Sequence, residues 1–162
     1  MNENKGHGFL PDVLKDEDYI FGSSKLPGDV IVPSGQWDEF LPSDEFQSRG
    51  SIETYNCTAY GTLHALAALM NRKFGDVHDF SERFLGILAE TDPKDGGNSP
   101  HRVAEALRHS GVIPEKDLPF DSTVATVEQY YSPKPMVKGH LRDAEEWLSQ
   151  HTFGHEWLYP VG

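Results

Sequence analysis

The chain has a single cysteine, Cys57, which stands at the start of a predicted helix. A thiolate is a strong nucleophile, whereas a free thiol has a pKa of about 8.5 and is mostly protonated at neutral pH. The unpaired N–H groups and the positive dipole end of a helix N-terminus both stabilise the anion. Residue type and position therefore predict a nucleophile. The alternative is that a lone cysteine is a small buried apolar residue.

The residues around Cys57 resemble the signature of a known family. Segments 47–50 (Gln-Ser-Arg-Gly) and 57–60 (Cys-Thr-Ala-Tyr) resemble the Gln-x-Gly…Cys-x-Ala-Phe pattern of the papain family of cysteine proteases. Thr58 follows the cysteine in place of the usual Trp, which is similar to the bacterial and phage branch of that family.

Three further blocks follow in the order that the family shows. Segment 80–85 (Phe-Ser-Glu-Arg-Phe-Leu) resembles Leu-Ser-Glu-Gln-Glu-Leu, segment 95–97 (Asp-Gly-Gly) resembles Asn-Gly-Gly, and segment 111–120 resembles Gly-Ile/Leu-x-x-Glu…Tyr-Pro-Tyr. The resemblance covers roughly residues 37–120. It implies an α+β papain-like fold, of which this chain is the N-terminal, mostly helical left domain. The right β-domain is then absent from the chain.

The resemblance also implies roles for individual residues. Cys57 would attack the scissile carbonyl, and its own N–H together with the Gln47 side chain would form the oxyanion hole. Each such donor contributes a rate factor of about 10²–10³. Gly96 and Gly97 would bind an extended peptide through their main chain, since the missing Cβ lets a peptide approach closely. Asn98 would lie near the wall of the pocket for the P2 side chain.

The sequence departs from the family pattern in two places. Nine residues, 48–56, separate Gln47 from Cys57, where the family has five. Asn56, next to the nucleophile, is therefore a second candidate for the oxyanion donor as well as a candidate helix N-cap. Asp95 replaces the family's Asn, and its carboxylate would either favour basic substrate side chains or face water.

We expect the general base that a catalytic cysteine needs to be missing from this chain. In the papain family the histidine and the Asn that orients it lie about 130–150 residues beyond the cysteine, and the sequence ends at residue 162. His64 is seven residues from Cys57 on the same predicted helix, which places it about 10 Å along the axis. His151 and His155 are interrupted by Gly154 and lack the Glu of a His-Glu-x-x-His motif. We expect neither an in-chain base nor a metal site or cofactor.

Composition indicates which binding partners and which cellular compartment to expect. Fourteen basic against 26 acidic side chains give a net charge of −12, which argues against nucleic acid as a partner. No apolar run approaches the roughly 20 residues of a membrane helix, and no signal peptide opens the chain. One cysteine allows no internal disulfide. These features predict a cytoplasmic protein of bacterial or phage origin.

Four helices are expected to position the site, over residues 57–73, 80–90, 100–110 and 139–150. The first has an apolar stripe at i, i+4, i+7 and i+11, with Asn56 as its N-cap. Asp79 and Glu82 have capping-box spacing at the start of the second helix, and Ser99 is placed to cap the third.

Three regions are expected along the chain: an extended N-terminal arm (1–35), the left domain (36–125), and a final region (126–162). The arm would contain a short strand at 29–32. The final region would combine an irregular segment over 121–138, the last helix, and a strand at 155–159 that crosses toward the second domain.

The function expected from these features is that of the N-terminal half of a papain-type cysteine peptidase. Cys57 would attack peptide bonds with a histidine supplied by the missing C-terminal domain, so the chain alone would be inactive. The expected partners are an extended peptide substrate, the missing domain, and a second copy of the chain through the exposed domain interface. The alternatives are a catalytically incomplete peptide-binding module and a phage structural component that reuses the fold.

Overall fold

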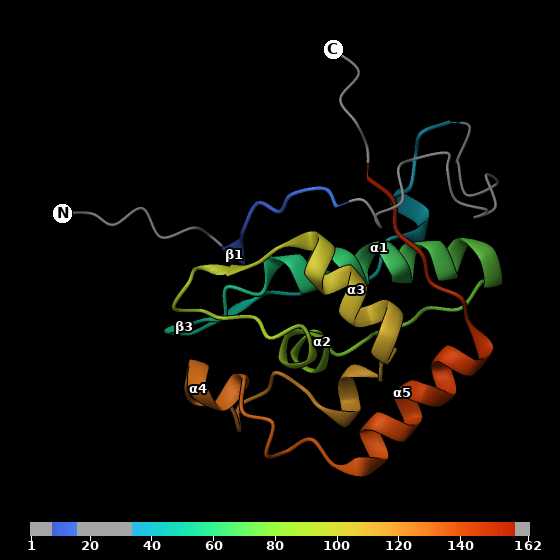
Figure 1. The fold of residues 1–162 in the computed structure, drawn as a ribbon. Coiled ribbons are helices and arrows are strands. Elements are labelled where there is room, and N and C mark those ends of the chain that lie inside the picture. Colours follow the sequence, from blue (N-terminus) through green and yellow to red (C-terminus); the bar gives the residue numbers. More distant parts are fainter. Residues whose placement is uncertain (1–7, 16–33, 158–162) are drawn as a thin grey trace.

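The computed structural model describes residues 8–15 and 34–157 (Figure 1). Three helices, α1 (Cys57–Phe74), α2 (Glu82–Leu88) and α3 (Pro100–Ser110), pack against one another, and α5 (Lys138–Gln150) lies against α3. Their apolar faces form one continuous core, which includes Ala59, Leu63, Leu66, Met70, Phe80, Leu85, Val103, Leu107 and Val112. Across these described residues, no helix is both long and apolar enough to cross a membrane.

Helix α1 confirms the predicted central helix and its buried stripe. The stripe residues Ala59, Leu63, Leu66 and Met70 are all buried. Gly75 ends the helix with a left-handed φ of 74°, and its N–H donates to the Asn71 carbonyl at 2.8 Å. A glycine adopts this conformation at no steric cost, so the predicted end of the helix is confirmed as well.

Helix α3 has the predicted bounds, and the Ser99 side chain accepts a hydrogen bond from Arg102 N at 3.1 Å. Helix α2 is shorter than predicted at both ends. Its N-cap is Ser81, whose Oγ accepts from Phe84 N at 3.1 Å, so the predicted capping role of Asp79 is wrong. The serine lies one position before the helix, where a side-chain oxygen reaches the third N–H.

The C-terminal region contains more structure than expected. A short helix, α4 (Val127–Tyr130), lies in the segment 121–138 that was predicted to be irregular, and Tyr130 within it is fully buried. Two 3₁₀ turns, η2 (Asp38–Phe40) and η3 (Glu115–Asp117), complete the described helices. Of the strand predicted at 155–159, Trp157 forms a single bridge, and residues 158–159 lie outside the described residues.

Within residues 8–15 and 34–157, four two-residue strands form two small sheets. β2 (Ser48–Arg49) and β3 (Ile52–Glu53) make an antiparallel hairpin just before α1. β1 (Gly8–Phe9) pairs in parallel with β4 (Gly97–Asn98), so the described start of the arm lies beside a segment about 90 residues away in sequence. The strand predicted at 29–32 lies outside the described residues.

Candidate active site

Cys57 is the first residue of α1 and is half-buried. The chain enters the helix through Tyr55, whose φ of 56° is unusual for a non-glycine residue. Gly8 of β1 packs against Tyr55 and Cys57. A Cβ on Gly8 would lie 2.9 Å from Cys57 Sγ and 2.7 Å from the Tyr55 carbonyl oxygen. The nucleophile predicted from sequence is therefore covered on one side by the N-terminal arm.

The environment of Cys57 raises its pKa. Burial is the main cause, and the nearby Glu53 carboxylate adds to it, while hydrogen bonds from the backbone N–H groups of Thr58 and Cys57 itself act in the opposite direction. The stabilisation of the anion predicted from the helix N-terminus is present, but desolvation outweighs it. Burial therefore shifts the balance at Cys57 toward the neutral thiol.

β4 offers a main-chain edge next to the cysteine, here termed the groove. The arm fills it: Gly8 N donates to the Gly96 carbonyl at 2.9 Å and Leu10 N donates to the Asn98 carbonyl at 2.7 Å. Asp12 then accepts a hydrogen bond from Ser99 Oγ at 2.8 Å, and this bond lowers the Asp12 pKa. The arm thus binds as an extended strand over three consecutive contacts.

Gly96 and Gly97 contribute to this groove in different ways. Gly96 supplies a main-chain acceptor to the arm. Gly97 pairs instead with Asp92, to which it donates an N–H at 3.0 Å and from whose N–H it accepts at 3.4 Å. Its contribution is the missing side chain, because a Cβ there would come within 2.2 Å of the Gly8 carbonyl oxygen.

The side chain of Asn98 does not face the groove. It is fully buried, and its amide nitrogen donates to the Ala89 carbonyl at 2.8 Å and to Thr91 Oγ1 at 3.1 Å, while its Oδ1 accepts from Ser99 N at 2.8 Å. These bonds shape the turn that presents β4. The expected position at a pocket wall is wrong for the side chain, and Asn98 acts in the groove through its carbonyl group.

Asn56 is also turned into the interior. Its Nδ2 donates to the Glu82 carbonyl and to Tyr130 Oη, both at 2.9 Å, and its side chain makes no capping hydrogen bond. Both amide hydrogens are thereby used inside the fold. The Asn56 side chain has no hydrogen left to donate to an oxyanion, so its candidacy as the oxyanion donor is not supported. Asn56 does occupy the predicted N-cap position, but its side chain makes no capping bond.

Gln47 lies at the foot of the hairpin β2–β3. Its carbonyl accepts from Thr54 N at 3.2 Å and from Thr54 Oγ1 at 2.8 Å, which closes the hairpin three residues before Cys57. The additional residues between Gln47 and Cys57 therefore form the β2–β3 hairpin, which Gln47 and Thr54 close. Gln47 Oε1 is buried and accepts no hydrogen bond from the described residues.

No histidine in the described part of the chain makes a hydrogen bond to Cys57. His64 points toward Glu45, with Nε2 at 3.4 Å from Oε2, and His101 and His155 contact each other at 3.1 Å. This agrees with the prediction that His64 is too far along α1 to act as the base.

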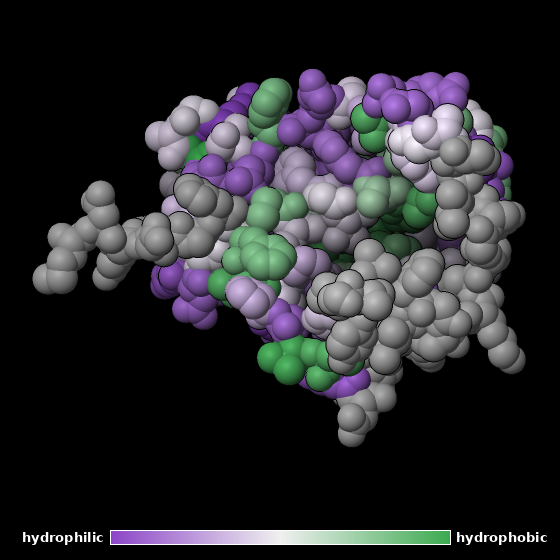
Figure 2. Space-filling model, turned by 90° about the horizontal axis from the view of Figure 1, so that it is seen from above, coloured by the Kyte–Doolittle hydropathy of each residue, from purple (hydrophilic) through white to green (hydrophobic). Residues whose placement is uncertain are grey.

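An apolar cavity of about 810 Å³ opens beside Cys57. Figure 2 shows a hollow with an apolar floor on this face. The cavity lies between the arm, α1, α3 and the segment 153–157, and its apolar lining includes Phe9, Leu66, Leu69, Ala104, Phe153 and Trp157. The face of α1 that carries the nucleophile therefore presents apolar surface next to the groove.

Sequence reasoning missed the part that the arm plays at the site. Gly8 and Phe9 precede Leu10 and Pro11, and an apolar run bounded by Gly and Pro is typical of a short extended segment. That signal indicates extended backbone. It does not indicate which edge the backbone pairs with, because the partner strand is also only two residues long.

No family model matches the chain, and no curated protein sequence matches it. Among solved structures, the chain is similar to xylellain, a cysteine protease from Xylella fastidiosa, with 22% sequence identity and a TM-score of 0.55. The match covers 96% of this chain and 59% of the xylellain chain, so the protein spans less than two thirds of the length of that structure. At this identity the likeness concerns the fold, and the chain has the α+β fold of a papain-like cysteine protease.

Proposed function

We propose that the chain is the N-terminal half of a papain-type cysteine peptidase that binds extended peptides along β4 and attacks them with Cys57. The observation that carries this proposal is the position of the arm. Its backbone lies extended on the main chain of β4, with Gly8 against the Cys57 sulfur. A peptide bound in the same groove would bring a main-chain carbonyl to the nucleophile.

The chemistry needs a base from outside the described elements. Because burial raises the pKa of Cys57, an imidazole must take the thiol proton before attack, and the imidazolium then favours the thiolate. The sulfur forms a bond to the carbonyl carbon, and the Cys57 N–H and Gln47 side chain stabilise the oxyanion. Collapse breaks the C–N bond, and the leaving amine takes the proton from the imidazolium. Water then hydrolyses the acyl-enzyme.

The second domain would dock on the face that holds the cavity. That face is apolar and lies beside Cys57, which suits a domain that must place a histidine at the sulfur while covering the floor of the cavity. Without that domain, exposed apolar surface favours self-association. Sedimentation of the 162-residue chain would then detect a dimer that a covering domain abolishes.

A second candidate function is peptide binding without cleavage. It is favoured by a specific observation: the groove for an extended main chain is complete, whereas no histidine of the described residues bonds to Cys57. A protein with this arrangement would hold a peptide by main-chain hydrogen bonds and leave it intact.

The two functions are separated by assaying the natural gene product with fluorogenic peptides beside its Cys57→Ala variant. Peptidase function predicts cleavage that Cys57→Ala abolishes and Gln47→Ala lowers by about 10²–10³. Val13→Ala is a matched control, because Val13 is exposed on the arm. Cleavage that survives Cys57→Ala would refute the peptidase proposal, whereas peptide binding without cleavage in both proteins would identify the binding module.

A further inference from the structure

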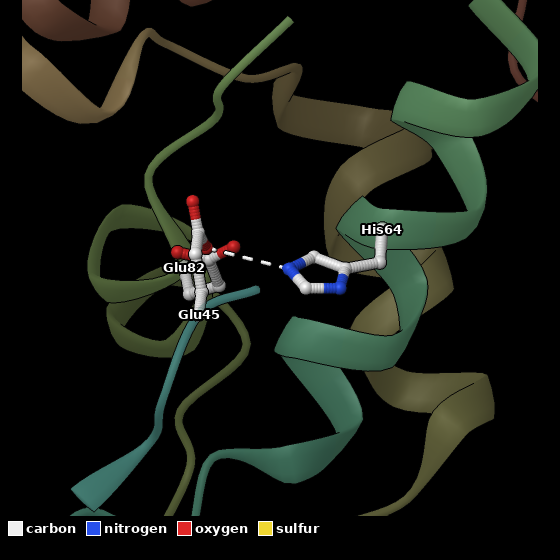
Figure 3. A group of neighbouring side chains, drawn as sticks. All are labelled: Glu45, His64 and Glu82. Carbon is white, nitrogen blue, oxygen red and sulfur yellow. Dashed lines mark hydrogen bonds and ion pairs between the residues drawn. The ribbon is translucent and has the colours of Figure 1, made fainter. Parts of the chain in front are cut away.

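Glu45, His64 and Glu82 bring their side chains together beside α1. Glu45 lies in the loop between η2 and β2, His64 on α1, and Glu82 is the first residue of α2. Their ligating atoms all lie within 4.8 Å of one another, and His64 Nε2 is 3.4 Å from Glu45 Oε2. Figure 3 shows the imidazole pointing at the two carboxyl groups.

Glu82 is the unusual member of this cluster, because its side chain is only 3% exposed. Apart from its own backbone N–H, no described donor outside the cluster bonds to the Glu82 carboxyl. Among the described residues, no Lys or Arg forms an ion pair with Glu45 or Glu82. A buried carboxyl without a cationic partner is costly as an anion. A cation shared with His64 and Glu45 would remove that cost.

Further carboxyl groups border the cluster and increase its negative charge. Asp79 is within hydrogen-bonding reach of Glu45, and Glu115 on η3 interacts electrostatically with both Glu45 and Glu82. In the absence of a cation, protons compensate for this charge. Burial and the adjacent Glu45 raise the pKa of Glu82 to about 10. Burial alone would raise the Glu45 pKa, but hydrogen bonds from Glu82, Asp79 and His64 lower it.

We propose that Glu45, His64 and Glu82 form a binding site for a divalent cation of the Zn²⁺ or Mn²⁺ class. Zn²⁺ and Mn²⁺ accept a ligand set of one imidazole and two carboxylates. This set suits them better than it suits Ca²⁺ and Mg²⁺, which prefer ligands that are all oxygen atoms. Ligands that bind Zn²⁺ at about 2.0–2.2 Å in a tetrahedron are about 3.4 Å apart. The His64–Glu45 pair already has that separation, and every pair of ligating atoms lies within 4.8 Å.

The proposed cation would have a structural consequence for the candidate active site. Glu45 is two residues before Gln47, and the segment that contains both is otherwise joined to α1 by the bond from Tyr60 Oη to the Phe46 carbonyl at 3.3 Å. A cation shared with His64 and Glu82 would tie this segment to α1 and α2. The cation would thereby hold Gln47, at the base of the hairpin β2–β3, in a fixed position relative to α1.

Sequence reasoning expected no metal site. Glu45, His64 and Glu82 are separated by 18 and 17 intervening positions and match no known spacing. The proposal is tested by titrating Zn²⁺ and Mn²⁺ into the 162-residue chain by calorimetry. A Cys57→Ser background removes the thiol, which would bind Zn²⁺ itself. In this background we expect one tight site, with affinity at least about tenfold weaker in His64→Ala and in Glu45→Gln.

A matched control uses another half-buried histidine. His101→Ala, on α3 beside His155, should leave the affinity unchanged. Bound Co²⁺, a spectroscopic substitute for Zn²⁺, should show visible absorption that His64→Ala alters and His101→Ala does not. Circular dichroism of each variant verifies its fold. If Glu82→Gln fails to fold, the His64 and Glu45 variants still decide the outcome.

Three results would overturn the proposal. The first is the lack of a binding signal with either cation. The second is equal affinity in the Cys57→Ser background and in its His64→Ala derivative. The third is loss of binding in His101→Ala, which would place the ion at the histidine pair on α3. The readout is binding and absorption, so it is independent of any peptidase activity.

Discussion

Gly8 lies directly against the sulfur of Cys57, close enough that a Cβ on Gly8 would be 2.9 Å from Sγ. Together with the hydrogen bonds from Gly8 to Gly96 and from Leu10 to Asn98, this contact places the arm over both the nucleophile and the groove that serves it. Any peptide that uses the groove must first displace the arm. The arm and an external peptide therefore compete for one surface.

This relationship predicts the effect of Gly8→Ala. The new Cβ would meet Sγ and the Tyr55 carbonyl, and the φ of 96° at this position is also unfavourable for alanine. Strain of about 1–3 kcal/mol should raise the population with the arm displaced by a factor on the order of 10. The rate of alkylation of Cys57 by iodoacetamide at fixed pH should rise by a similar factor. Val13→Ala on the same arm is the control, and an equal rate in Gly8→Ala would show that the arm does not cover the thiol.

The pH dependence of the same alkylation reaction is a second prediction. Burial raises the pKa of Cys57, so the rate measured between about pH 6 and pH 10 should have its midpoint above the roughly 8.5 of a free thiol. In Gly8→Ala the midpoint should move to lower pH, because a displaced arm exposes the sulfur to water. A midpoint well below pH 8 in the unaltered chain would mean that the helix N-terminus activates the thiol by itself.

The parts of the fold that depend on neighbouring residues could be predicted, and those that depend on distant ones could not. Helix α3 has the predicted bounds because Ser99 and Gly111 mark its ends within the helix's own sequence. In contrast, the partners of the Asn56 amide lie 26 and 74 residues away. An asparagine before a helix is an ordinary N-cap by sequence, and only the packed position of Tyr130 shows why this one turns inward.

In the candidate site, too, local features could be predicted from the sequence and features that depend on distant residues could not. The position of Cys57 at the start of α1 was predictable from residue type and order. The pKa of Cys57 was not, because it depends on burial beneath an arm whose pairing with β4 joins residues 89 apart in the chain. A helix dipole acts within one turn and is readable locally, whereas desolvation is a property of the assembled structure.

The buried position of Asn56 predicts a large loss of stability in Asn56→Ala. The substitution leaves the Glu82 carbonyl and Tyr130 Oη without their donor in a fully buried setting. Each unsatisfied buried group costs about 1–3 kcal/mol, so the free energy of unfolding should fall by about 2–4 kcal/mol in urea titrations. Asn71→Ala is matched in chemistry but removes one bond at a partly exposed site, and should cost about 1 kcal/mol or less. Similar losses in the two variants would refute the interior role of Asn56.

Glu115 predicts how stability changes with pH. Burial is the main cause that raises its pKa to about 7, assisted by Asp79 and Glu45. A carboxyl whose pKa is raised on folding stabilises the protein fully below its unfolded value of about 4.3, and this stabilisation is lost as the pH rises through about 7. Because Glu115 keeps some contact with solvent, we expect the loss to be about 1–3 kcal/mol between about pH 5 and pH 8.

Urea unfolding at a series of pH values, compared between the unaltered chain and Glu115→Gln, isolates this contribution from that of the other carboxyls. Glutamine stays neutral and its oxygen can still accept the hydrogen bond that Phe120 N donates to Glu115 Oε1 at 2.7 Å, so the variant should lose less stability as the pH rises. Glu128→Gln is the control: hydrogen bonds from its own backbone and from Thr126 lower the pKa of Glu128, so it is ionised throughout this range. Parallel pH profiles for the unaltered chain and Glu115→Gln would mean that Glu115 is already ionised in the folded protein at about pH 5.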